Sequence, residues 1–368
     1  MKEERQRILK MVQEGKLSVN EALTLLEELD KSSKTMEQKQ EEIIHELSEA
    51  VNYEEAKKED SVHHKFQSVK DKIFDFVDSA LKKIKDFDLD LNFGRSIEVS
   101  HIFHHGEAIV KEIDVDVANG AVKLVPWDQR DVRIECNAKV YRVHSQEEAR
   151  QSFIKEVLFA VEGGKMRFST QQKWMKVDAK IYVPQEDYDY VRVRMFNGPI
   201  EGKNLKVNNL KVKAANGKIN LDAIISRKTE VEIANGHIQL SNSTADEIEL
   251  ESINGAIQLD GDFVKADVQT FNGDVHCSLK NRTESIVAKA TTGSIDIFLP
   301  ESVSAEGELK TNLGGFSVEL EGIQIVEEKT EKIQKMLRFK PVNDEKKVVK
   351  VFADSKTGSI HLKNVQEF

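Results

Sequence analysis

The stretch IANGHIQLSN, residues 233–242, carries the pattern that decides the fold, and it recurs as SINGAIQLDG at residues 252–261. Each copy holds an Asn-Gly step followed by alternating apolar and polar residues. Successive Asn-Gly steps place glycines at positions 198, 217, 236, 255 and 273, so the spacings are 19, 19, 19 and 18 residues. The series continues at Thr292-Gly293, Leu313-Gly314 and Thr357-Gly358, and an earlier copy stands at Asn119-Gly120. A regular period of this length predicts stacked structural repeats.

Apolar residues stand two and four positions after each glycine, as Ile238 and Leu240 do after Gly236. A second apolar alternation precedes the next Asn-Gly step, as at Ile248 and Leu250. Two short strands per repeat with one inward row predict a mainly β fold, a β-solenoid of ~19-residue coils over residues 96–368. The alternative is a meander in which each Asn-Gly is a hairpin turn. The near-constant period favours the solenoid, because each coil inherits its register from its neighbour.

Two insertions interrupt the repeats, and both are expected to cap or decorate the ends of the solenoid. In the first, Ser145 to Glu148 form a capping box, which predicts a helical insertion at about residues 145–162, ending at Gly163-Gly164. The second covers about residues 322–345, and its mixture of apolar and charged residues predicts a helix around residues 328–337.

The first 30 residues predict a small all-α region. An apolar stripe around Ile8 and Leu9 is followed by Gly15 and then by a capping box from Ser18 to Glu21, so residues 1–30 form a helical hairpin. Such a short hairpin buries little surface alone, so we expect it to dimerise or to dock on something else. Residues 31–64 are charge-dense and predict a linker that is helical in part.

Residues 65–93 predict an amphipathic helix with bulky apolar residues on one face and lysines beside it. Between residues 65 and 85 there are 6 Lys and 3 Asp, a local excess of positive charge in an acidic chain. The helix either packs on the β domain or on a second copy, or it lies on an anionic membrane surface. The residues expected to make the membrane or partner contact are Lys70, Phe74, Val77, Leu81, Lys82 and Lys83.

The composition excludes several classes of protein. The chain has 368 residues and a net charge of −10, which disfavours a nucleic-acid partner. Its two cysteines, Cys136 and Cys277, form no metal-binding or disulfide pattern. The first residues, MKEERQRILK, are not followed by an apolar segment, so a Sec signal peptide is not expected. We therefore expect a cytoplasmic protein, peripheral at the membrane, with export to the cell surface by a non-Sec route as the alternative.

No residue pattern predicts a catalytic, cofactor or metal site. His101, His104 and His105 cluster, but on a strand only two of them share a face. Cys277 takes the position that Leu259 holds in the preceding coil and is expected to lie in the core, and Cys136 is expected to be buried likewise. An outward polar row is also expected, which is a solvated sheet or a surface that binds carbohydrate or peptide: Asn220, Gln239, Gln258, His276, Asp296 and His361.

The run EGKLSVNEALTLLEEL at residues 14–29 resembles the short helical N-terminal module of the YvlB/LiaX-like proteins of Gram-positive bacteria. The repeats from Ser96 onward are similar to the adhesin-like β-repeat domain that follows that module in the same family. The resemblance implies a role in the cell-envelope stress response. In the LiaX branch it implies sensing of membrane-active peptides by the helical part and inhibition of a stress signalling system by the β part. The family brings no catalytic motif and no cofactor.

The function that we expect is therefore that of a non-enzymatic envelope-stress protein, a regulator or sensor of membrane-active peptides and antibiotics. Its expected partners are a protein of the stress signalling system, an anionic membrane surface and a second copy of the chain bound through the N-terminal helices. The alternative is a surface adhesin-like binding module. A solenoid-type carbohydrate-active enzyme ranks below both, because no row of Asp with a neighbouring Arg marks the adjacent coils.

Overall fold

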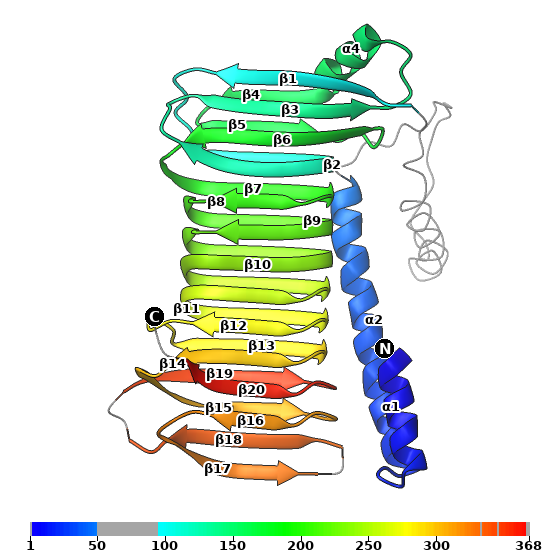
Figure 1. Ribbon diagram of the computed structural model, residues 1–368, viewed down its shortest axis with the longest axis vertical. Helices are drawn as coiled ribbons and strands as arrows, with labels where there is room; N and C mark the ends of the chain where they lie inside the picture. Colours follow the sequence, from blue (N-terminus) through cyan, green and yellow to red (C-terminus); the bar gives the residue numbers. More distant parts are fainter. Residues whose placement is uncertain (1, 50–94, 332, 344–345, 366–368) are drawn as a thin grey trace, which may run out of the picture.

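The computed structural model describes residues 2–49, 95–331, 333–343 and 346–365 (Figure 1). The helices are α1 (Lys2–Gln13), α2 (Val19–Glu49) and α4 (Gln146–Glu156). The strands are β1 (Ile97–His105), β2 (Glu112–Trp127), β3 (Val132–Val140), β4 (Val157–Glu162), β5 (Lys165–Thr170), β6 (Met175–Pro184), β7 (Asp187–Asn197), β8 (Ile200–Lys203), β9 (Lys206–Asp222), β10 (Ile225–Asn254), β11 (Ile257–Asn272), β12 (Val275–Leu279), β13 (Ser285–Thr292), β14 (Ile295–Pro300), β15 (Val303–Thr311), β16 (Phe316–Glu319), β17 (Ile323–Thr330), β18 (Lys335–Pro341), β19 (Lys347–Ser355) and β20 (Ile360–Val365).

The repeats form a β-solenoid, as the period predicts, and the meander is excluded. Ile238 pairs in parallel with Ile219 in the preceding coil and with Ile257 in the following coil, each 19 residues away. A hairpin turn at Asn-Gly would instead make the flanking strands antiparallel. The strands therefore stack coil upon coil into the tall column that Figure 1 shows.

The core of the solenoid is the inward row of each strand. Leu240, Leu259 and Cys277 are direct neighbours in three successive coils and are at most 1 % exposed. The prediction that Cys277 replaces a core leucine is thus confirmed, and Cys136 is also buried. This continuous core lies entirely within the β domain and contains no side chain of α1 or α2.

Two coils are stacked out of sequence order. The β2 coil stacks between the β5–β6 coil and the β7–β8 coil, although in the sequence β5 and β6 stand between β2 and β7. At the other end, β19 and β20 are inserted between β13–β14 and β15–β16. The C-terminal coil is consequently an interior layer of the stack, which explains why Thr357-Gly358 keeps the repeat motif after a long insertion.

The first insertion caps one end of the column. Ser145 accepts a hydrogen bond from the Glu148 amide at the start of α4, and Phe153 of this helix is fully buried. The helix ends at Glu156 rather than near residue 162, so the expected extent is wrong. Residues 157–162 form β4, which pairs antiparallel with β5 through a turn at Gly163-Gly164. Sheet pairing along β5 outweighs continuation of the helix there.

The helix predicted around residues 328–337 is wrong. This segment belongs to the antiparallel hairpin of β17 and β18, and β18 extends the sheet beyond β15. Leu337 and Phe339 alternate at the required period of two and are at most 5 % exposed, with Leu337 opposite Leu309. The exposed backbone edge of β15 therefore selects strand geometry for a segment whose residue pattern also fits a helix.

The N-terminal hairpin is present, but its second helix is much longer than the expected limit of about residue 30. The capping box forms, with Glu21 Oε2 accepting from the Ser18 amide at 2.7 Å and Ser18 Oγ accepting from the Glu21 amide at 3.3 Å. Helix α2 then continues to Glu49, through the first part of the segment expected to be a linker. Residues 31–42 hold no Gly or Pro, so nothing interrupts the helix.

No helix among the described residues combines the length and the apolar character that crossing a membrane requires. The amphipathic helix predicted at residues 65–93 lies outside the described residues, and with it lie Lys70, Phe74, Val77, Leu81, Lys82 and Lys83.

Candidate functional site

The Asn-Gly corners form one straight edge of the solenoid, held by a ladder of asparagine side chains. From Asn197 onward, each Nδ2 group donates to the Oδ1 atom of the asparagine in the adjacent coil at 2.7–3.0 Å, and the ladder joins Asn119, Asn197, Asn216, Asn235, Asn254 and Asn272. The glycines allow the corners to stack this closely. At Gly236, with φ of +146°, a Cβ atom would lie 1.7 Å from the Gly217 carbonyl oxygen.

An apolar row runs beside this ladder on the outer side of the solenoid. The residue before each asparagine points outward, and we call this row the corner stripe; it consists of Ala118, Phe196, Ala215, Ala234, Ile253 and Phe271. Side chains of α2 pack on the stripe, chiefly Ile43, Ile44 and Leu47. Figure 1 shows α2 lying along this edge of the column, parallel to the stacking direction. The stripe is therefore a helix-binding surface.

Polar contacts fix the register of α2 on the corner stripe. Glu46 forms an ion pair with Lys213, and Lys39 forms one with Glu251. Glu46 and Lys39 are seven residues apart, which is about 10.5 Å along a helix. Lys213 and Glu251 are two coils apart, which is about 9.6 Å at normal strand spacing. Because the two distances match, a straight helix can follow the solenoid without losing register.

Side chains of the ladder also contact α2 directly. Gln40 donates to Asn235 Oδ1 at 3.2 Å, and Asn272 donates to the Met36 sulfur at 3.2 Å. The Lys39 ammonium group lies 5.9 Å from the centre of the Phe271 ring, in cation–π range. These contacts place a cation and an apolar surface side by side at the stripe.

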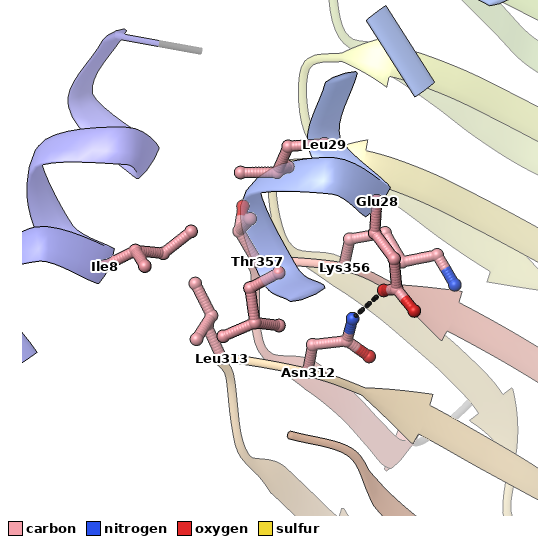
Figure 2. A pocket seen from close by; sticks show the side chains of 8 residues that line it. Ile8, Glu28, Leu29, Asn312, Leu313, Lys356 and Thr357 are labelled. Atoms are coloured by element: carbon pink, nitrogen blue, oxygen red, sulfur yellow. Dashed lines mark hydrogen bonds between the residues drawn. The ribbon is translucent and has the colours of Figure 1, made fainter. Parts of the chain in front are cut away.

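The hairpin is anchored at the other end of α2 by the last coils (Figure 2). Asn312 donates to Glu28 Oε2 at 2.7 Å, as the dashed line in Figure 2 shows. Arg7 of α1 donates to the carbonyl oxygens of Leu313 and Thr357, at 3.4 Å each. Ile8 is fully buried between these elements. The anchor thus combines these three hydrogen bonds with apolar packing of Leu313 and Ile333 on the hairpin core.

The ion pair at the far end of α2 shifts the pKa values of both partners. Burial alone would raise the pKa of Glu46, but the hydrogen bond and the positive charge of Lys213 outweigh it and lower this pKa. Burial alone would lower the pKa of Lys213, yet its hydrogen bonds to Glu46 and Glu232 raise it. Both groups are therefore held in their charged forms at neutral pH.

The sheet face next to the corner stripe carries bands of charge. Strands β7 and β9 present Arg192, Arg194, Lys211 and Lys213, whereas β10 and β11 present Glu230, Glu232, Glu249, Glu251 and Asp267. The bands meet through ion pairs such as Lys211–Glu230 at 3.2 Å and Lys213–Glu232 at 2.9 Å. The carboxylates line a shallow cleft of about 380 Å³ beside Ile253 and Phe271 of the stripe.

The outward polar row predicted on the second sheet has the expected register. Its six residues are neighbours in successive coils, and Asn220, Gln239, Gln258 and His276 are exposed. The His276 ring packs 4.7 Å from the ring of Phe298. Within the described part of the chain, the amide groups of Asn220, Gln239 and Gln258 form no side-chain hydrogen bond, so they remain available to a ligand.

The histidine cluster does not converge. His104 pairs with Asp131, while His101 packs 4.5 Å from the Phe103 ring and also contacts Phe153 of α4. Across residues 2–49 and the described β domain, no three His, Cys, Asp or Glu side chains are grouped so that they could hold a metal ion. Burial raises the pKa of Cys277 and of Cys136 to about 12, which leaves both thiols protonated and unreactive.

The corner stripe is a helix-binding surface that was not predicted from the sequence. Its signal was present in the repeat itself, because an apolar residue precedes Asn119, Asn197, Asn216, Asn235 and Asn254 although that position points outward. An outward apolar position repeated over several coils predicts a covering element. The alternation within a single strand does not reveal this surface, because the direction of the residue before each asparagine is decided by the Asn-Gly corner that follows it.

The fold and this helix-covered edge define a class of protein, a β-solenoid with an attached N-terminal helical module. Residues 110–361 match the family described as Toastrack DUF4097, and residues 3–34 match a SHOCT-like domain. The chain is 44% identical to protein YvlB of Bacillus subtilis strain 168 over 368 residues, which is 100% of both chains. This chain therefore belongs to the Toastrack DUF4097 family and to its YvlB-like members.

Two solved structures described as adhesins match part of this chain at low similarity. One from Bacteroides fragilis matches with a TM-score of 0.42 and 14% identity, covering 73% of this chain and 97% of that chain. Another from Parabacteroides distasonis matches with a TM-score of 0.39 and 10% identity, covering 73% of this chain and 98% of that chain.

Proposed function

We propose that this chain is a non-enzymatic protein of the cell-envelope stress response that acts through protein–protein contacts. In this proposal the solenoid is a rigid platform, and the α1–α2 hairpin is the element that responds to membrane-active peptides or antibiotics. The observation that carries the proposal is the seating of α2 on the corner stripe, because that seating can be reversed without unfolding the solenoid.

The seating of α2 can be reversed because the apolar side chains of the protein form separate clusters. The side chains of α2 that pack on the stripe form a cluster separate from the solenoid core, and those between α1 and α2 form another. Three of the six stripe residues are alanines, which bury little surface each. Release of the hairpin would therefore lose the contacts on the stripe, the two ion pairs and the polar contacts of the anchor, but none of the solenoid core, and it would expose the stripe to a signalling partner.

The chemistry of the site suits competition by a cationic amphipathic helix. The Lys39 ammonium group shows how a cation binds there: it forms an ion pair with the Glu251 carboxylate and lies near the Phe271 ring. Glu249 and Asp267 line the same cleft. A membrane-active peptide that carries lysines beside an apolar face would make equivalent contacts and displace α2.

Amide hydrogen exchange on the full-length protein tests this mechanism. Adding a cationic amphipathic helical peptide should increase exchange in α2 and at the corner strands, with little change in the solenoid core. The double variant Glu249→Lys/Glu251→Lys should abolish the response, because it removes most of the negative charge of the cleft. The matched control Glu162→Lys/Glu301→Lys makes the same charge change on exposed residues elsewhere and should respond as wild type.

The role in cells is tested with an envelope-stress reporter in a Gram-positive host. Deleting the chain should change the response of the reporter to the same peptide, and the Glu249→Lys/Glu251→Lys variant should not restore it. A reporter that responds identically with and without the chain contradicts the proposal.

We also propose a cytoplasmic location, peripheral at the membrane. Fractionation of cells into cytosol, membrane and surface-accessible pools tests this location. Recovery of the protein in the surface-accessible pool would instead support non-Sec export.

A second candidate function is that of an adhesin-like binding module, and the polar row on the second sheet favours it. Exposed amides at Asn220, Gln239 and Gln258 repeat at the strand spacing of about 4.8 Å. Cosedimentation with insoluble cell-wall glycan tests this function. Binding that is lost in Gln239→Ala/Gln258→Ala and kept in Asn208→Ala would support it, and absence of binding would exclude it.

A further inference from the structure

The N-terminal hairpin has a second apolar face, which is largely exposed to solvent. Its inner face contributes Ile8, Leu25 and Leu29, all at most 3 % exposed. On the outside, Leu9, Val19 and Leu23 are 54 %, 65 % and 52 % exposed. Val12 and Leu26 lie at the border of this face; they are half-buried and pack in part against the hairpin core. Large aliphatic side chains that are exposed as a group mark an interaction site.

Helix geometry gathers these residues into one patch. Val19, Leu23 and Leu26 follow the spacing i, i+4 and i+7, so they share one face of α2. The two helices are antiparallel and are joined by an ion pair between Arg5 and Asp30. That pairing places position 9 of α1 across from position 26 of α2. We call this set of five residues, Leu9, Val12, Val19, Leu23 and Leu26, the outer patch.

The charges of the two helices indicate what covers the outer patch. Helix α1 holds four basic and two acidic residues. The facing part of α2, residues 19–30, holds four acidic residues and no Lys or Arg. Lys10 of α1 and Glu27 of α2 are exposed on the two sides of the patch. When two such hairpins are related by a twofold rotation, the basic α1 of one copy can face the acidic part of α2 of the other copy.

We propose that the outer patch is a homodimer interface, in which two copies of this chain pair hairpin to hairpin. The twofold axis runs parallel to the helices, so that α1 of one copy packs on α2 of the other and basic residues face acidic ones. A perpendicular axis would place the two basic helices together and is disfavoured. The product is a four-helix arrangement with an apolar centre, and both solenoids remain outside it.

Sedimentation or light scattering of the full-length protein measures the outcome. Wild type should have twice the chain mass of 41.8 kDa at micromolar concentrations. Leu23→Lys should be monomeric with an unchanged melting temperature, because the side chain is already half exposed in the single chain. The matched control Ile225→Lys replaces another exposed aliphatic residue, 52 % exposed on the solenoid, and should leave the dimer intact.

A charge swap tests the orientation. Lys10→Glu alone and Glu27→Lys alone should each weaken the dimer at least tenfold, and the double variant should restore it. A wild-type protein that stays monomeric at high micromolar concentration overturns the proposal. A dimer that Leu23→Lys leaves unaffected also overturns it. Neither result bears on release of α2 from the corner stripe, since that process uses residues 36–47 of α2, none of which belongs to the outer patch.

Discussion

Asn197 donates a hydrogen bond to the side-chain oxygen of Asn119 at 2.9 Å, although 78 residues separate the two in sequence. The bond has the same geometry as those between consecutive coils, such as Asn216 to Asn197 at 2.7 Å. The β2 coil thus joins the ladder as a regular member. The straight edge that α2 follows depends on this placement, since Ala118 and Phe196 both belong to the corner stripe.

Replacing Asn119 by Ala should therefore destabilise the β domain. Asn119 also donates to the Lys173 carbonyl oxygen at 3.1 Å, so the change removes two hydrogen bonds from a site that is 8 % exposed. We expect a loss of about 1–3 kcal/mol in the free energy of unfolding, measured by urea denaturation. Asn208→Ala on the exposed surface is the control and should cost less than about 0.5 kcal/mol.

Gly236→Ala should be costly because a Cβ atom would collide with the Gly217 backbone. The position has φ of +146° and the nearest atom would be 1.7 Å away, so neither the conformation nor the space admits a side chain. We expect a loss of about 3 kcal/mol in a thermal or chemical melt. Gly315→Ala, with nothing within 4 Å of the added atom, should change stability by less than about 1 kcal/mol. Equal stability of the two variants would contradict the corner geometry.

Leu259→Asp and its neighbour Gln258→Asp should differ strongly. Leu259 is 0 % exposed between Leu240 and Cys277, so Asp there would bury an unpaired charge and cost about 4 kcal/mol or more. Gln258 points outward and is exposed, so its substitution should be nearly silent. Melting temperatures of the two variants give the comparison, and similar losses would show that the register is wrong.

Docking of α2 should depend on pH through Glu46. Its pKa is lowered in the docked state, so its contribution is complete above the ordinary value of about 4.3 and is lost as the pH falls through the lowered value. Hydrogen exchange in α2 should therefore accelerate in that acidic range. Glu46→Gln should show a weaker acid dependence than wild type. Identical pH profiles of the two proteins would show that Glu46 does not contribute to the free energy of docking.

Full-length protein should bind anionic vesicles through residues 65–93, as their amphipathic pattern predicts. Cosedimentation should weaken with added salt, since exposed charges are screened over about 10 Å at 0.1 M. Phe74→Glu should abolish binding by placing a charge among the acyl chains, and Lys82→Glu/Lys83→Glu should weaken it on anionic lipid only. If neither wild type nor variant binds and Phe74→Glu lowers the melting temperature, the segment packs on protein instead.

The sequence by itself determined the coil. The 19-residue spacing of Gly217, Gly236 and Gly255 favoured parallel stacking over a meander, because inherited register keeps a period constant. Alternation around Leu259 and Cys277 assigned the core row, since side chains of a strand point to opposite faces. The capping boxes at Ser18 and Ser145 correctly marked two helix starts, because they involve only neighbouring backbone groups.

The tertiary structure alone decided the order of the coils and the partners of the helices. Every coil offers the same backbone edge and the same apolar row, so the sequence cannot specify that Gly358 stacks between Gly293 and Gly314. The open edge of β15 likewise turned residues 335–341 into a strand, although their composition also suits a helix. Helix α2 extends beyond Asp30 because the corner stripe buries Ile43, Ile44 and Leu47, a surface that exists only after distant coils have stacked.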